Sequence, residues 1–353
     1  MTGRSAASAR WVPAGKIRVP LPGASILVPR RSMLVGVGSF AAIVVVALVA
    51  LSLGDYPLSL PQVVAALTSD QGFASKIVVE WRLPRVLAAI MFGAALAVSG
   101  ALFQTLTRNP LGSPDVIGFS TGAYTGAIVV ITLVGGGLIA TSMGALVGGL
   151  VTAVIVYALA WRRGVQGFRL IIVGIAITAT LNSVNSYLLL RAQTEVAMSA
   201  SIWGAGSLSL VGWDRLMISA VPLALLAVVT MFVAAPLRQL ELGDDAARAH
   251  GVRAEPARLA VLVIGVAMIA VVTAATGPIA FIALSAPQIA RRIAASAGIP
   301  IGVSALVGAV LLLAADVIAQ HVVSASVPVG IVTVVIGGLY LIALLIKEAR
   351  KQL

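Results

Sequence analysis

EWRLPRVLAAIMFGAALAVSGALFQTLTRNPLGSPDVIGFSTGA, residues 80–123, holds two apolar runs separated by a polar turn. Arg82 and Arg85 open the first run at a spacing that would put both on one helix face. Pro84 suits a first helical turn, and Ser113-Pro114-Asp115 repeats this start signal before the second run. The stretch predicts a helix, a turn at a membrane surface and a second helix whose positive end is matched by Asp115.

The composition is that of an integral membrane protein. Of the 353 residues, 60% are hydrophobic and only 10% are charged, whereas a soluble domain is about 25% charged. The chain has no cysteine, and His250 and His321 form no recognisable metal motif. It contains neither a phosphate-binding G-x-x-x-x-G-K-[ST] loop nor a Ser-His-Asp grouping. We therefore expect no catalytic residue, no cofactor and no metal site.

Ten stretches come close to the roughly 20 apolar residues that a membrane-spanning helix needs. They predict an all-α integral membrane protein in which residues 33–353 form one ten-helix domain. The eighth stretch is short and contains Pro287, so we expect it to cross only part of the bilayer. The predicted spans are 33–53, 86–106, 115–134, 138–160, 169–189, 216–236, 257–275, 279–293, 301–319 and 329–346.

The basic residues give these spans an orientation. Residues 1–32 are basic and rich in proline, so we expect an uncleaved, disordered cytoplasmic arm. With the arm inside and ten spans, the outward loops hold few of the 24 basic residues, namely Lys76, Arg82, Arg85, Arg191 and Arg215. Because basic loops remain inside, both termini are predicted to be cytoplasmic in a lipid-embedded chain of the cytoplasmic membrane. The net charge of +12 then needs no nucleic acid to explain it.

Three loops are long enough to be informative. Residues 54–85 form a long outward loop, and residues 190–215 carry Trp203 and Trp213, which suit a short helix at the headgroup level. The longest inward loop, 237–257, reads as two short helices joined at Gly251, with acidic residues near their starts. This loop is either an ordinary solvated hairpin or a docking surface for another protein.

Few polar side chains fall within the predicted spans. Asn182 and Asn185 share one helix face and could line a path or hydrogen-bond between helices, and Gln104 is a further path candidate. Asp316 is the only carboxylate deep in a span, and we expect it to form a buried ion pair or a cap rather than a proton relay. Glycines such as Gly93 and Gly100 predict close helix packing.

Several of these stretches, in order, resemble the permease subunits of bacterial type II ABC importers, the FecCD family, which carry iron–siderophore complexes, haem or cobalamin. The resemblance covers nearly everything after residue 50 and is strongest to the ferric-enterobactin branch of the family. The matching stretches are 82–85 (RLPR), 93–100 (GAALAVSG), Gln104, 108–118 (RNPLGSPDVIG), 277–284 (GPIAFIAL), 286–291 (APQIAR), 314–316 (AAD) and 328–333 (PVGIVT).

The resemblance implies roles for individual residues. Arg82 and Arg85 match outward arginines that meet acidic residues of a substrate-binding protein, and a third such position looks like Gln320 here. The family's Pro-His in span eight is Pro287-Gln288, so no role that needs an imidazole carries over. Loop 237–257 looks like the family's ATPase-coupling helices. Its coupling residues would be Gly243, Asp244, Asp245, Ala246, Ala249 and Gly251.

The resemblance also implies partners and a fold. We expect ten spans built as inverted repeats, a sister permease subunit in a heterodimer, two cytoplasmic ATPase subunits and an extracytoplasmic siderophore-binding protein. The expected cargo is a ferric siderophore of the catecholate type. The alternatives are a cobalamin or haem permease, and, from other classes, an ion-coupled secondary transporter or a non-transporting membrane scaffold or receptor.

Overall fold

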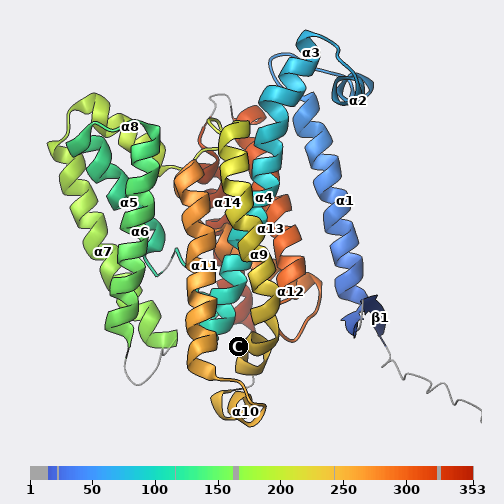
Figure 1. The fold of residues 1–353 in the computed structure, drawn as a ribbon, viewed down its shortest axis with the longest axis vertical. Helices are drawn as coiled ribbons and strands as arrows, with labels where there is room; N and C mark the ends of the chain where they lie inside the picture. Colours follow the sequence, from blue (N-terminus) through green and yellow to red (C-terminus); the bar gives the residue numbers. More distant parts are fainter. Residues whose placement is uncertain are drawn as a thin grey trace, which may run out of the picture.

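The computed structural model describes residues 15–21, 24–115, 117–161, 167–241, 243–323 and 327–352. A two-stranded hairpin precedes a bundle of long helices, with α2 at one end of the bundle and α10 at the other (Figure 1). We refer to these as the α2 end and the α10 end. The long elements are α1 (Arg30–Ser52), α4 (Leu83–Thr107), α5 (Phe119–Val129), α6 (Leu138–Ala160), α7 (Gly167–Arg191), α9 (Trp213–Glu241), α11 (Ala254–Thr276), α12 (Ile282–Ile293), α13 (Ile301–His321) and α14 (Val329–Gln352).

Each predicted span corresponds to one of these helices. Seven helical stretches of the described chain are long and apolar enough to cross a membrane, and Phe119–Val134 and Val329–Ala343 are shorter apolar helices. The expected partial span is α12, which has 12 residues and contains Pro287. At 1.5 Å per residue it is about 18 Å long, less than the roughly 30 Å of a hydrocarbon core.

The predicted long loop at residues 54–85 is mostly helical, so that prediction is wrong. It contains α2 (Leu60–Thr68), α3 (Phe73–Ser75) and the π-helical turn η1 (Lys76–Arg82). Ser59 and Gln62 form a capping box that starts α2. The turn η1 runs directly into α4, and Leu83 N–H bonds to Val78 O. Pro84 therefore follows a π-turn within a continuous helical stretch rather than opening a free helix end.

The predicted start of the third span at residue 115 is also wrong. Ser113 and Pro114 lie in a turn whose carbonyl oxygens accept bonds from Ile117 N–H and Phe119 N–H. The helix α5 begins only at Phe119, after Gly118 adopts the left-handed conformation at φ 92°. It continues through the π-helical turn η2 (Val130–Val134). A side chain at Gly118 would meet Thr178 of α7, which explains why glycine is suitable there.

The basic arm is not disordered over its described part. Strands β1 (Lys16–Leu21) and β2 (Ala24–Pro29) pair antiparallel, with Lys16 opposite Pro29. Apolar and basic residues alternate along β1 from Lys16 to Val19, whereas β2 holds the consecutive apolar residues Ile26, Leu27 and Val28. The hairpin continues directly into α1 at Arg30, and Arg30 N–H bonds to Gly15 O. Residues 1–14 of the predicted arm lie outside the described chain.

The helix α4 occupies the centre of the bundle. Its buried residues include Phe92, Leu96 and Phe103, and it packs against α9, α11, α12 and α13. A side chain at Gly93 would clash with the Gly308 backbone of α13, and one at Gly100 with the Ala283 backbone of α12. The close packing predicted for these two glycines is therefore present.

Candidate functional site

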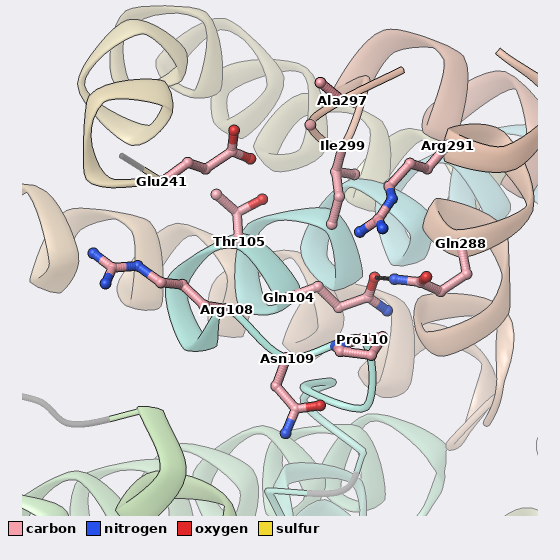
Figure 2. A pocket seen from close by; sticks show the side chains of 11 residues that line it. Gln104, Thr105, Arg108, Asn109, Pro110, Glu241, Gln288, Arg291, Ala297 and Ile299 are labelled. Atoms are coloured by element: carbon pink, nitrogen blue, oxygen red, sulfur yellow. Dashed lines mark hydrogen bonds between the residues drawn. The ribbon is translucent and has the colours of Figure 1, made fainter. Parts of the chain in front are cut away.

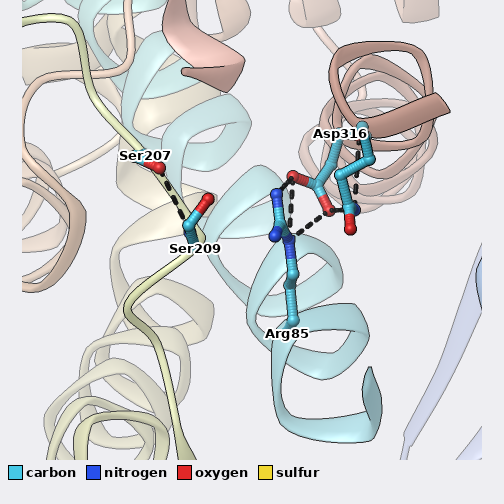
Figure 3. Close-up of polar contacts among 5 residues, drawn as sticks. Arg85, Ser207, Ser209 and Asp316 are labelled. Atoms are coloured by element: carbon cyan, nitrogen blue, oxygen red, sulfur yellow. Dashed lines mark hydrogen bonds and ion pairs between the residues drawn. The ribbon is translucent and has the colours of Figure 1, made fainter. Parts of the chain in front are cut away.

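The α2 end of the bundle carries an ion pair between α4 and α13. Arg85 Nη2 lies 2.8 Å from Asp316 Oδ1, and Arg85 Nε lies 3.0 Å from Oδ2 (Figure 3). Gln320 Nε2 donates to the same Oδ2 at 2.7 Å. The Asp316 side chain is only 2% exposed and that of Arg85 is 19% exposed. The buried ion pair expected for Asp316 is present, and it joins this path candidate to Arg85 and Gln320, the two residues expected at the docking surface.

Arg82 bonds to backbone carbonyl groups at the α2 end rather than to a carboxylate. Its Nη1 donates to Leu51 O and its Nη2 to Tyr56 O, both at 2.7 Å. Both carbonyls belong to the end of α1 and the segment after it, so Arg82 fixes the connection between α1 and α2. The guanidinium remains partly exposed and retains further N–H donors for an external carboxylate.

A polar pocket of about 240 Å³ lies at the α10 end (Figure 2). Gln288 Nε2 donates to Gln104 Oε1 at 2.6 Å, and Gln104 Nε2 donates to Leu284 O at 2.9 Å. This pair joins α4 to α12 and gives Gln288 a hydrogen-bond partner. The pocket is completed by Thr105, Arg108, Asn109, Pro110, Glu241, Arg291, Ala297, Gly298 and Ile299.

The predicted coupling loop contains one short helix rather than two. Helix α10 spans Asp244–Ala249, and the second expected helix is the start of α11. Gly243 and Gly251 bracket α10 at φ 112° and 79°, conformations that favour glycine. A small apolar cluster of Leu240, Ala247 and Ala254 holds the segment together. The described side chains of Asp245, Arg248 and Ala249 are exposed.

The four residues predicted to line a path, Gln104, Asn182, Asn185 and Asp316, do not form one cluster in the structure. Gln104 and the Arg85–Asp316 pair lie toward opposite ends of α4, about 28 Å apart at 1.5 Å per residue. Asn182 is exposed, whereas Asn185 is buried and neither atom of its amide group has a described hydrogen-bond partner. The structure thus separates Asn182 from Asn185 by burial, although both lie on α7.

Sequence reasoning missed a cavity of about 640 Å³ at the α2 end. It is lined by Arg215 together with the hydroxyl side chains of Thr141, Ser142, Ser199, Ser207 and Ser209, two of which Figure 3 labels. Helix α8 (Thr194–Gly204) is the short surface helix expected in this loop. Its Trp203 stacks on Tyr124, and Trp213 Nε1 donates to Val79 O at 2.9 Å. Both tryptophans therefore make contacts within the protein.

Comparisons with known proteins agree with this geometry. Residues 42–347 match the FecCD transport family. The ferric enterobactin transport system permease protein FepG of Escherichia coli strain K12 is 48% identical over 329 residues, which cover 93% of this chain and 100% of the relative. The hemin transport system permease protein HmuU of Yersinia pestis is 33% identical over 318 residues, covering 88% of this chain and 94% of the relative.

A solved structure shares the fold. A chain described as an inward-facing conformation of a metal-chelate type ABC transporter superposes with a TM-score of 0.78 and 26% identity, covering 89% of this chain and 99% of that one. The helices, their apolar length and this likeness define a multi-pass membrane protein of the transport-permease class. Within that class, the chain belongs to the FecCD transport family.

Proposed function

We propose that this chain is the membrane permease subunit of an ABC importer for a ferric siderophore of the catecholate class. The observation that carries the proposal is the 48% identity along the whole length of FepG, whose name assigns it to ferric enterobactin transport. The chain supplies a conduit, and ATP hydrolysis on separate subunits supplies the energy, since the sequence has no phosphate-binding loop of its own.

Two ATPase subunits would dock at the α10 end. Support comes from the exposed residues Asp245, Arg248 and Ala249, which stand on a segment held by its own apolar cluster. The glycines Gly243 and Gly251 allow the tight turns that present α10, and Asp244 and Ala246 belong to the same short helix. In this arrangement the α10 end and both termini are cytoplasmic.

An extracytoplasmic siderophore-binding protein would dock at the α2 end through the surface that Arg82, Arg85 and Gln320 hold together. The bonds that Arg82 and Arg85 make within the chain preorganise both guanidinium groups, and the exposed part of Arg82 can meet an external carboxylate. Such charge contacts chiefly aid orientation and encounter rate. Asp316 serves this surface as the counter-ion of Arg85.

The translocation path would run between this chain and a sister permease, most simply in a heterodimer. Gln104, Asn182 and Asn185 are its candidate lining residues, with Asp316 at its outer edge. The unpartnered amide of Asn185 supports a role beyond the folded monomer, since a buried polar group without a partner is costly. A large anionic cargo is better released from diffuse contacts than from a tight site.

Reconstitution tests the proposal. Proteoliposomes that contain this chain, a sister permease and an ATPase should import ferric enterobactin only with ATP and the binding protein. Ferric hydroxamate and hemin should be imported at least tenfold more slowly. Preferred uptake of hemin would favour the haem alternative, which the similarity to HmuU supports. Uptake driven by a proton gradient without an ATPase would contradict the proposal and favour an ion-coupled transporter.

A further inference from the structure

A crevice of about 720 Å³ opens on the outside of the bundle at the α10 end. One wall is α9, from Ala227 to Arg238, and the other is formed by the β hairpin, the first turn of α1 and the start of α13. The lining combines small and apolar residues with charged ones. The apolar ones include Val98, Ala227, Met231, Ala234, Val303 and Ala305, the charged ones are Lys16, Arg238 and Glu241, and Ser32, Thr230 and Ser296 add hydroxyl groups.

The length of the apolar wall matches half of a bilayer. The eleven-residue separation of Ala227 and Arg238 corresponds to about 16 Å along α9. One leaflet of a hydrocarbon core is about 15 Å thick, half of the 30 Å total. Met231 is 75% exposed on this face of α9, although it is apolar. An extended acyl chain therefore fits the wall in both length and polarity.

The charges gather where the crevice meets the α10 end. Lys16 and Arg238 are both exposed, and neither forms an ion pair with any described residue. Glu241 adds one carboxylate to the lining, and its Oε2 lies beside Gly298. Arg30 and Arg31 open α1 at the same end, and Arg31 Nε donates to Ile293 O. Positive charge outweighs negative charge here, which favours a negatively charged headgroup.

We propose that this crevice binds one phospholipid with a net negative headgroup from the cytoplasmic leaflet. Its phosphate would lie between Lys16 and Arg238, and one acyl chain would extend along α9 toward Ala227. A zwitterionic phospholipid would have the same acyl chain, but its headgroup has no net charge and would not be attracted to Lys16 and Arg238. The inference concerns the lipid around the protein and does not depend on which cargo the chain transports.

Native mass spectrometry of the purified full-length protein tests the proposal. Phosphatidylglycerol should bind in clear preference to phosphatidylcholine. Each of Arg238→Gln and Lys16→Gln should weaken phosphatidylglycerol binding about fivefold, and the double variant about 25-fold. Arg238→Lys should retain most of the binding. The matched control is Arg169→Gln, which removes a charge from the start of α7, on the opposite side of the bundle in Figure 1, and should bind as the parent does.

A second pair of variants tests the acyl chain separately. Ala227→Trp should fill the crevice and reduce phosphatidylglycerol binding, whereas Val229→Trp changes a neighbouring exposed position outside the crevice and should not. Thermal unfolding of each variant establishes that it is folded. Equal binding by the double variant and the parent overturns the proposal, as does an equal loss in Arg169→Gln. Displacement of the lipid by soluble glycerol phosphate, or an unaffected Ala227→Trp, would show that no acyl chain occupies the crevice.

Discussion

At the residue scale, the Arg85–Asp316 ion pair joins α4 to α13 through a carboxylate that is almost fully buried. Removing one partner leaves an uncompensated charge on a side chain that is at most 19% exposed. We expect Arg85→Met or Asp316→Leu alone to lower the free energy of unfolding by about 3 kcal/mol. The double variant should lose less than either single one, because two apolar side chains of similar volume can pack there.

Thermal unfolding in detergent measures this prediction. Asp245→Asn is the control, because the Asp245–Arg248 pair is exposed and 3.9 Å long, and its loss should change Tm little. Additive losses in the double variant would contradict a coupled pair.

The contact of Gly100 with Ala283 makes a second residue-scale prediction. The Cβ of Gly100→Ala would overlap the Ala283 carbonyl oxygen, so α4 and α12 must separate. We expect a loss of about 1–3 kcal/mol of stability, measured as a lower Tm. Gly38→Ala on α1 meets open space and should be neutral or slightly stabilising. An equal loss in both variants would mean that the close contact of Gly100 with α12 does not decide the outcome.

At the scale of elements, the turn after α10 depends on one left-handed glycine. Gly251→Ala would strain a φ of 79° by about 1–2 kcal/mol and misplace α10. We expect transport and coupled ATP hydrolysis to fall at least tenfold, while the subunit still assembles with its partners.

The control variant is Gly72→Ala, which introduces a similar backbone strain at the α2 end of the bundle. Gly72 has a φ of 61° and meets open space, as Gly251 does. Gly72→Ala should leave ATP hydrolysis intact in the reconstituted complex. If both variants couple normally, the coupling role proposed for residues 243–251 is wrong.

The spans were predictable from sequence because the length of an apolar run is a strong signal, and each predicted span became a helix. The predicted helix boundaries were wrong where the backbone departs from a regular α-helix. The π-turn at Lys76–Arg82 extends α4 backward beyond Pro84, and the turn at Ser113–Asp115 delays α5 to Phe119. At the second boundary the chain approaches α7 closely, since a side chain at Gly118 would meet Thr178.

The candidate sites were predictable in part. Motif resemblance located Arg82, Arg85 and Gln320, but it could not show that Arg85 shares the carboxylate of Asp316 with Gln320, because Arg85 and Asp316 are 231 residues apart in sequence. The partner of Gln104 was missed for the same reason. A carboxylate alone in an apolar span was the useful signal, since its burial requires a partner.

At the scale of the whole molecule, docking of the binding protein should respond to Arg82, whose replacement leaves the buried Arg85–Asp316 pair intact. We expect Arg82→Gln to slow the association of the two proteins several-fold at low salt, with a smaller effect at high salt. Surface plasmon resonance on the reconstituted complex measures the rate. Lys76→Gln, on the same end, is the control. Identical slowing in both variants would indicate general charge attraction rather than a specific contact.

The continuous helix α9 has a mechanical consequence for the assembled protein. Its 29 residues make a rod about 43 Å long, from the cavity that holds Arg215, past the crevice proposed to bind lipid, to Glu241 near the start of α10. A rigid tilt of about 10° around its α2 end would shift its α10 end by about 7 Å. Pro222 and Pro236 are the points at which this rod could bend instead. Stiffness at these two prolines would therefore decide how much of such a tilt passes from one end of the bundle to the other.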